Sequence, residues 1–358
     1  MNLGVFLAIG ESIQDLKKKG QESLFVNNNL KNYSRNFTKV YVFSYANENL
    51  TFFDNVYILP NKYHIHRYLY ALIGPLFHRK YLRSCAVYRA YQLTGIIPSF
   101  TAKALWGKKI VLNFGYPYEQ IADVEGKTIA TQVLKLVKNL LLPFSDTIII
   151  TQDFLKQLLP ESLHPKTVLI PNSVDTAVFK PTKTTKKYTA VFVGRLEKQK
   201  NLSVLIKALS YLPPKNRSLL LIGHGSLTKP LQTLCKNFKV NLKLYSKIEN
   251  NKLPQYLNQA KIFILPSAVE GHPKALLEAM SCGLACIGNN IPAIKEVFKN
   301  KSGLLYNGSV KDLEDKIRHL LRDSKLMREL GKKGRKRVME NYDFNKIARK
   351  EIALLKNI

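Results

Sequence analysis

The chain has 358 residues, of which 46% are hydrophobic and 23% charged, and it carries a formal net charge of +31. This length exceeds what one hydrophobic core usually fills, so the composition predicts a two-domain globular enzyme or binding protein. No apolar run approaches the about 18 residues of a membrane-spanning helix. The positive charge favours a polyanionic partner: nucleic acid, anionic lipid or a diphosphate ligand.

Strand-like and helix-like segments alternate from the start of the chain. In the first half, short apolar runs predict strands at residues 3–9, 40–44, 109–113, 147–151 and 167–170. Residues 1–10 lack the basic region and cleavage site of a signal peptide, which predicts a first strand and a cytoplasmic protein. The four cysteines show no metal-ligand spacing and are predicted to be buried thiols in a reducing compartment.

The second half continues this alternation. Apolar runs predict strands at residues 190–193, 218–222, 242–245, 262–265 and 285–288, and helical periodicity covers residues 202–212, 227–238 and 274–282. Strand–helix alternation predicts parallel sheets with helices on both faces, and the polar segment 171–187 predicts a domain boundary. The expected fold is α/β, with two doubly wound Rossmann-like domains facing across a cleft.

Two glycine-containing segments follow predicted strands in the second half. Gly194 precedes Arg195 and Lys200, two cations that could bind a diphosphate beside a helix start, although a surface pair capping a loop is the alternative. Gly223 and Gly225 would let the backbone approach a ligand, but strand-to-helix turns need glycine in any case. Ser226, which follows directly, is predicted to cap the next helix.

A third segment brings two carboxylates together. Glu270 lies in the loop after a predicted strand, and Glu278 lies on the helix that follows. Two carboxylates in one site can act as acid and base, or accept hydrogen bonds from a polyol. Apolar residues surround Glu278 in the sequence, so its carboxylate is predicted to have a partner.

In order and spacing, these segments resemble family 4 of the retaining glycosyltransferases (glycosyl transferases group 1), which have the two-domain GT-B architecture. The resemblance covers most of residues 165–350, including residues 170–175, the glutamate pair, Glu296 and residues 341–344. It implies an acceptor-side Rossmann-like domain at residues 1–172 and a nucleotide-sugar-binding domain at residues 173–343. A C-terminal helix, residues 344–358, is implied to cross back to the first domain.

The resemblance also implies roles for particular residues. Arg195 and Lys200 match the cations that bind the donor diphosphate, and Glu270 matches the residue that contacts the transferred sugar. These three are the implied catalytic residues, and Glu278 matches the glutamate that accepts hydrogen bonds from the ribose. The further donor-binding positions are Gly10, Gly194, Gly223, Gly225, Ile248, Gly271, His272, Pro273 and Lys274.

The sequence departs from the family pattern at three places. The family often has a histidine where this chain has Asn113, and its glycine-rich first loop is reduced here to Gly10. His272 and Pro273 replace the commoner Phe-Gly, a variant found among polysaccharide and lipid-linked glycan enzymes.

The resemblance implies a retaining hexosyltransferase that uses a UDP-sugar, with a GDP-sugar as the other candidate donor, and no cofactor. The acceptor expected is a glycan or a lipid-linked glycan of cell-surface polysaccharide synthesis. The chain has no Asp-x-Asp motif, and the acidic residues 312–315 are typical of an amphipathic helix, so metal-independent transfer is predicted. A nucleotide-sugar epimerase and, on charge alone, a nucleic-acid-binding protein are the alternatives, but no nucleic-acid-binding motif is present.

A stretch at residues 62–91 interleaves basic and aromatic side chains. Arg79 and Arg83 would share one face of a helix, and Gly74-Pro75 is expected to break the stretch in two. Basic and aromatic residues together favour an anionic membrane surface. The stretch therefore predicts peripheral attachment to the inner membrane leaflet, with a tyrosine-rich core helix as the alternative. Its remaining basic and aromatic members are Tyr63, Arg67, Tyr68, Tyr70, Phe77, Lys80, Tyr81, Tyr88, Arg89 and Tyr91.

Overall fold

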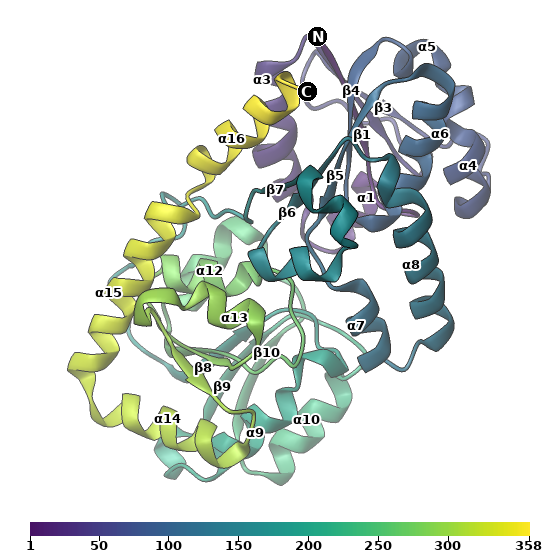
Figure 1. The fold of residues 1–358 in the computed structure, drawn as a ribbon. Helices are drawn as coiled ribbons and strands as arrows, with labels where there is room; N and C mark the ends of the chain where they lie inside the picture. Colours follow the sequence, from purple (N-terminus) through teal and green to yellow (C-terminus); the bar gives the residue numbers. More distant parts are fainter. The chain divides into compact units, whose positions relative to one another are not determined.

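The computed structural model describes residues 1–358, which divide into two compact units (Figure 1). The first unit comprises residues 1–122, 127–171 and 347–358, and the second comprises residues 123–126 and 172–346. None of the helices combines the length and the apolar character that crossing a bilayer requires.

The first unit is built on a parallel sheet in the order β3-β2-β1-β4-β5-β6-β7. Side chains alternate along each strand, so Val5 and Phe6 enter two separate hydrophobic clusters, as do Val42 and Phe43. The strands are β1 Asn2–Phe6, β2 Lys39–Phe43, β3 Val56–Leu59, β4 Cys85–Ala90, β5 Lys109–Phe114, β6 Thr147–Ile150 and β7 Thr167–Leu169.

Helices cover both faces of this sheet. They are α1 Ile13–Lys18, α2 Glu22–Leu24, α3 Lys31–Asn36, α4 Arg67–Phe77, α5 Arg79–Leu82, α6 Ile96–Trp106, α7 Tyr118–Val124, α8 Thr128–Leu141 and α16 Phe344–Lys356. The last of these lies beside α3 in Figure 1, and its Ile347, Ile352 and Leu355 belong to one of the clusters of the first unit.

The stretch at residues 62–91 differs from its prediction. Helix α4 continues through Pro75 to Phe77, so the break falls at His78 instead of at Gly74-Pro75. Helix α5 ends at Leu82, and Arg83 follows as its cap in helical geometry. The N–H of Arg83 donates to the carbonyl of Arg79 at 3.0 Å, so these two residues lie one helical turn apart, as predicted. Residues 85–90 form strand β4, which is not among the predicted strands because Arg89 interrupts its apolar pattern.

The second unit is built on a parallel sheet in the order β10-β9-β8-β11-β12-β13. Its strands are β8 Tyr188–Val193, β9 Ser218–Ile222, β10 Asn241–Tyr245, β11 Ala260–Leu265, β12 Ala285–Asn289 and β13 Leu304–Tyr306. The predicted strands of this half are all present, extended at their ends by up to two residues. Strand β13 is an addition to the strands predicted from the sequence.

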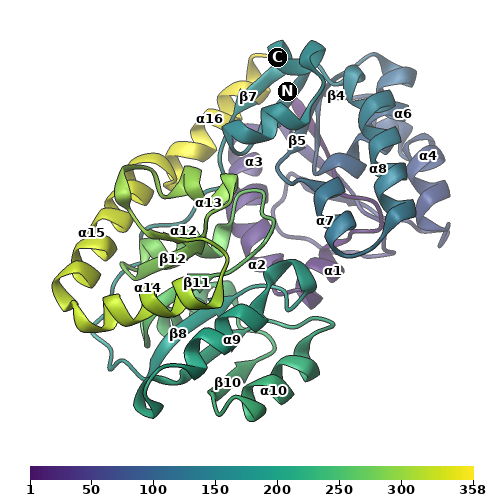
Figure 2. The same ribbon diagram turned by 60° about the horizontal axis from the view of Figure 1, so that its bottom comes forward.

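Helices flank this second sheet, with α9 between α10 and α14 and with α12 against α15 (Figure 2). The helices are α9 Leu202–Ser210, α10 Thr228–Asn237, α11 Leu253–Leu257, α12 Lys274–Ser281, α13 Pro292–Val297, α14 Val310–Arg322 and α15 Ser324–Asn341. One continuous cluster of buried apolar residues fills both faces of the sheet. Cys235, Cys282 and Cys286 lie in that cluster as free thiols, and Cys85 is a buried free thiol of the first unit, as predicted.

Candidate functional site

The candidate site lies where the strand order of the second sheet reverses. From β8 the chain proceeds to β9 and β10 on one side, and then returns to place β11 on the other side of β8. In open α/β sheets, ligands bind at the carboxyl ends of the strands at such a switch point. The loops after β8 and β11 therefore meet at the position that the topology favours for a ligand.

A buried ion pair joins these two loops. Lys200 ends a short 3-10 helix, Lys198–Lys200, after β8, and its Nζ lies 2.5 Å from Oε1 of Glu270 in the loop after β11. Both residues are less than one-tenth exposed. A buried pair of this kind needs further hydrogen bonds to offset the loss of hydration. Ser267 supplies one, because its hydroxyl donates to the same Glu270 oxygen at 2.7 Å.

Backbone contacts hold the loop after β11 in place. The N–H of Ala268 donates to the carbonyl of Gln199 at 2.9 Å, which ties this loop to the 3-10 helix a second time. The side-chain amide of Asn289, at the end of β12, donates to the carbonyl of Ser267 at 3.1 Å. Glu270 is therefore positioned by elements from three neighbouring strands.

The glycines after β8 and β9 also allow close packing between loops. A Cβ on Gly223 would lie 1.9 Å from the carbonyl oxygen of Gly194, and one on Gly225 would lie 2.4 Å from that of Leu196. These glycines thus let two loops pack backbone against backbone. Ser226 does not cap α10, because its hydroxyl donates to Glu197 at 2.6 Å.

Glu278 has the partner that its apolar surroundings predicted. It lies buried on α12, and the side-chain amide of Asn250, in the loop after β10, donates to its Oε1 at 2.9 Å. Burial raises the pKa of Glu278, while the charge of Lys274 and the Asn250 hydrogen bond act in the opposite direction. Asn250 was not among the predicted site residues, because its position in a polar loop carries no signal of this contact.

His272 links the loop after β11 to the segment that precedes β8. Its Nδ1 accepts the backbone N–H of Asn172 at 2.9 Å, and the side chain of Asn172 donates to the carbonyl of His272 at 2.8 Å. The ring also packs edge-on against Tyr342. Burial, followed by the charge of Arg337, lowers the pKa of His272 to about 3, so the ring is neutral at physiological pH. Its Nε2 is buried without a hydrogen-bond partner.

The second unit thus brings together most of the predicted site residues. Arg195 lies exposed directly after β8, and Gly271 and Pro273 are buried beside Glu270. Ile248 packs partly buried against the core of the same unit. Gly10 belongs to the first unit, where its φ of 75° disfavours any residue with a Cβ.

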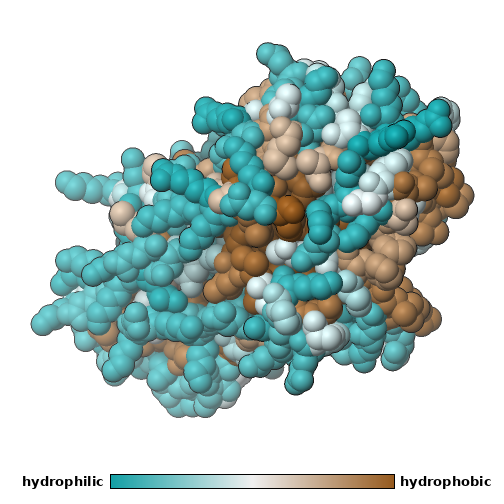
Figure 3. Space-filling model, turned by 45° about the horizontal axis from the view of Figure 1, so that its top comes forward, coloured by the Kyte–Doolittle hydropathy of each residue, from teal (hydrophilic) through white to brown (hydrophobic).

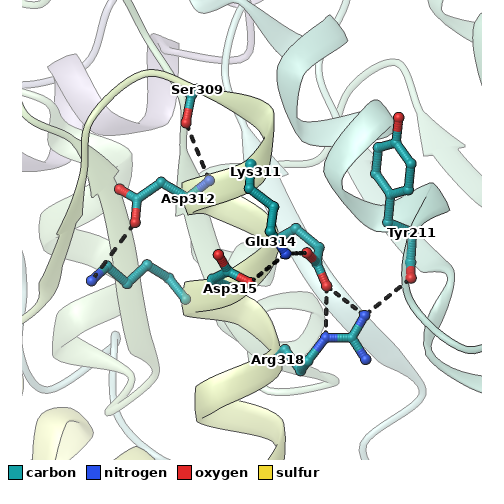
Figure 4. A network of polar contacts seen from close by, with 8 residues as sticks. Tyr211, Ser309, Lys311, Asp312, Glu314, Asp315 and Arg318 are labelled. Atoms are coloured by element: carbon teal, nitrogen blue, oxygen red, sulfur yellow. Dashed lines mark hydrogen bonds and ion pairs between the residues drawn. The ribbon is translucent and has the colours of Figure 1, made fainter.

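The acidic residues at 312–315 lie on helix α14, as predicted, and bind cations of that helix (Figure 4). Lys311 bridges Glu314 and Asp315 at 2.9 and 2.8 Å, and Arg318 also binds Glu314. Arg318 donates further to the carbonyl of Tyr211, which fastens α14 to the end of α9. The structure contains no group of three or more His, Cys, Asp or Glu side chains arranged to hold a metal ion.

The sequence of the second unit matches a known family. Residues 173–337 match the family model described as glycosyl transferases group 1. This part of the chain is a group 1 glycosyltransferase domain. The match includes the loops after β8 and β11 and helix α12, so the resemblance drawn from the sequence is confirmed.

Curated relatives support the same family. The chain is 30% identical over 204 residues to the UDP-Gal:alpha-D-GlcNAc-diphosphoundecaprenol alpha-1,3-galactosyltransferase of Escherichia coli, and the aligned region covers 51% of each chain. It is 27% identical over 160 residues to the N-acetyl-alpha-D-glucosaminyl L-malate synthase of Bacillus anthracis, covering 44% of this chain and 42% of the relative. The chain therefore spans about half the length of the curated relatives it matches.

Solved structures confirm the predicted GT-B fold over the whole chain. Sucrose-phosphate synthase from Thermosynechococcus elongatus superposes with a TM-score of 0.81 at 16% identity, covering 100% of this chain and 98% of the other. HepE of Anabaena, solved in complex with UDP, superposes with a TM-score of 0.78 at 14% identity and covers 100% of both chains. At these identities the likeness shows the fold alone.

Proposed function

We propose that this protein is a retaining hexosyltransferase that moves a sugar from a nucleotide diphosphate donor, a UDP-sugar in preference to a GDP-sugar, to a glycan or lipid-linked acceptor. Lys200, buried and paired with Glu270 at the switch point of the second sheet, carries the proposal. The E. coli relative uses UDP-Gal by its name, and HepE was solved with UDP, which supports the choice of donor.

The proposed chemistry assigns the cations to the leaving group. As the bond between the sugar and the diphosphate breaks, negative charge grows on the diphosphate, and preplaced cations stabilise that charge. Arg195 and Lys200 take this role, together with the free N–H groups at the start of α12. Oε1 of Glu270 already accepts hydrogen bonds from Lys200 and Ser267. These bonds favour a role for Glu270 in positioning the sugar over a role as nucleophile.

Ligand binding and product analysis test the proposal together. In a thermal-shift screen of UDP, GDP and ADP, the cognate nucleotide at 100 times its Kd should stabilise the folded state by about 2.7 kcal/mol. The corresponding nucleotide sugars are then incubated with acceptor glycans, and products are identified by mass spectrometry and NMR. A transferred sugar with retained configuration is expected. An epimerised nucleotide sugar without transfer would indicate the epimerase instead.

Changing Glu278 to glutamine should weaken nucleotide binding. The change removes the charge that would accept hydrogen bonds from the ribose hydroxyls, a loss of about 1.5–3 kcal/mol. This corresponds to a Kd for UDP about 10- to 100-fold higher by isothermal titration calorimetry. Glu249→Gln, an exposed glutamate near Asn250, is the matched control and should bind UDP normally. Unchanged affinity in Glu278→Gln would contradict the ribose role.

Transfer should continue in excess EDTA. The proposal assigns the diphosphate charge to Arg195, Lys200 and the start of α12, so chelation of divalent ions should leave the initial rate unchanged. The rate is measured as UDP release with and without EDTA. Activity that disappears with EDTA and returns only with Mn²⁺ or Mg²⁺ would contradict the metal-independent mechanism.

The acceptor side of the proposal places the protein in the cytoplasm, at the inner leaflet of the membrane. Apolar side chains lie exposed along two helices of the first unit: Leu69, Leu72 and Leu76 on α4, and Ile129, Val133, Leu136 and Leu140 on α8. Figure 3 shows a brown region at its right edge, on the side of the molecule where Figure 1 labels α4 and α8. Exposed apolar side chains that line one face of a helix typically mark a surface that binds a membrane or a partner. The E. coli relative acts on a diphosphoundecaprenol substrate by its name, which supports a membrane.

The structure changes which residues of the stretch at residues 62–91 could face a membrane. Tyr70 is buried on α4, and Tyr88 and Arg89 are buried on strand β4, so these three are core residues of the first unit. Exposed cations remain beside α4, at Arg67 and at residues 79, 80 and 83. Each such residue adds about 1 kcal/mol near an anionic surface.

In a flotation assay, the wild-type protein should rise with anionic vesicles and rise less with neutral vesicles or at high salt. The double variant Leu72→Glu/Leu136→Glu should remain at the bottom, because it places charges in both apolar stripes. Met339→Glu, an exposed apolar position of the second unit, is the matched control and should float normally. Wild-type protein that stays at the bottom with both vesicle types at low salt would favour a soluble acceptor.

A further inference from the structure

The first unit contains a cavity of its own at one edge of its sheet. The cavity has a volume of about 440 Å³. It is lined by residues 47–49, which follow β2, by residues 57–60, 62 and 63, in and after β3, and by residues in and between α4 and α5. Segments that follow parallel strands at their carboxyl ends are the usual ligand-binding elements of open α/β sheets. The volume falls within the range of about 300–1,000 Å³ typical of small-molecule sites.

Aromatic rings form much of the cavity wall without being part of the core. Tyr57, Tyr63, Phe77 and Tyr81 line the cavity and are between 39% and 68% exposed. The rings of Tyr63 and Phe77 lie 5.2 Å apart between centroids, at the junction with helix α4. Large rings that remain exposed around a hollow offer apolar faces to a ligand, and the tyrosines also offer hydroxyl groups.

The inner wall of the cavity is held in a fixed arrangement. Tyr70 stacks on Phe43 with 4.7 Å between ring centroids, and its hydroxyl pairs with Nε2 of His78 at 2.8 Å. Burial lowers the pKa of His78 to about 4, so the ring is neutral at physiological pH. Glu48 accepts the backbone N–H groups of Ile13 and Gln14, each at 3.0 Å, and its charge is thereby engaged at the start of α1.

Besides the tyrosine hydroxyls, the polar groups left to meet a ligand are two amides and one amine. Asn47, Asn49 and Lys62 are exposed at the cavity, and Lys62 is the only cationic residue of the lining. Recognition of a phosphate usually combines several cations or backbone N–H groups. Aromatic faces with amide donors and acceptors suit a neutral ring that has apolar C–H faces and a rim of hydroxyl groups.

We propose that this cavity binds a saccharide ring of the acceptor, with Tyr63 and Phe77 against the face of the sugar and Asn47 and Asn49 at its hydroxyls. This assignment rests on the proposed function, because it places one part of the acceptor in the first unit. The cavity adjoins the apolar stripe of α4 at Phe77, which suits a sugar carried on a lipid.

Binding of free monosaccharides to the full-length protein tests the site. N-acetylglucosamine, galactose and glucose are titrated and followed by saturation-transfer NMR. Tyr63→Ala and Asn49→Ala should each bind the preferred sugar about tenfold more weakly. Tyr211→Ala, a similarly exposed tyrosine of the second unit, should bind it normally. Unchanged affinity in both cavity variants, or displacement of the sugar by UDP, would overturn the proposal, since UDP would identify the donor site.

Kinetics separates this proposal from the proposed function. With a working acceptor, Tyr63→Ala should raise the acceptor KM about tenfold and leave the donor KM and the rate of donor hydrolysis unchanged. If the protein binds a sugar in the cavity but transfers none, the proposed function fails and the cavity assignment stands. If it transfers sugar with an unchanged acceptor KM in Tyr63→Ala, the cavity assignment fails alone.

Discussion

The single variants Lys200→Ala and Arg195→Ala should each have a kcat about 100- to 1,000-fold lower than the wild type, with little change in the donor KM. Each change removes a preplaced cation whose contribution grows as the diphosphate leaves, and the loss of one such group typically costs about 2.7–4 kcal/mol. The measurement is the initial rate of UDP release with saturating donor. Lys198→Ala, an exposed lysine on the same 3-10 helix as Lys200, is the matched control and should retain normal turnover.

Loss of Lys200 also leaves Glu270 buried without its cation, which by itself destabilises a fold by about 3–5 kcal/mol. The double variant Lys200→Met/Glu270→Gln separates the two effects. It removes both charges and should recover much of the lost stability without recovering turnover. Near-native turnover in both Arg195→Ala and Lys200→Ala would remove these residues from the site.

Replacement of Arg89 by leucine should destabilise the first unit by about 3–5 kcal/mol. Arg89 is 3% exposed in β4, and its Nε lies 2.7 Å from Oε1 of Glu351 on α16. Tyr33 donates to the same oxygen at 2.9 Å. Removal of the guanidinium leaves the Glu351 carboxylate beside the hydrophobic cluster without its counter-charge, which weakens the attachment of α16.

Urea unfolding measures this effect through Trp106, the single tryptophan, which lies on α6 of the first unit. Arg89→Leu should shift the transition to lower urea, whereas the exposed Arg83→Ala should not. Arg89→Leu/Glu351→Leu should regain part of the loss, because no buried charge remains. An unchanged transition in Arg89→Leu would show that the pair does not hold α16.

Much of the second unit could be predicted from local sequence. Its central strands are buried on both faces and read as short apolar runs, and helices α9, α10 and α12 show helical periodicity within two residues of their observed ends. The order of these elements implies the switch point, and with it the loops that hold Arg195, Lys200 and Glu270. The spacing from Glu270 to Glu278 is a local property, and it carried much of the family resemblance.

The first unit was harder to predict, because its polar core depends on distant partners. Strand β4 contains Arg89, which breaks the apolar pattern, and the residue that neutralises this charge is 262 positions away. The stretch at residues 62–91 looked like one basic and aromatic surface. The structure divides it into an exposed part around α4 and a buried part that includes Tyr70 and Tyr88.

The sequence by itself thus determined the α/β class, the strand-to-helix junctions of the second unit and the carboxylates of the candidate site. Tertiary structure decided which groups those side chains meet: Lys200 with Glu270 across 70 positions, Asn250 with Glu278 across 28, and Asn172 with His272 across 100. Periodicity reports only whether a residue faces a core or solvent, which is set by its neighbours in the chain. A buried charge or amide needs a specific partner, and the folding of distant segments onto one sheet edge supplies it.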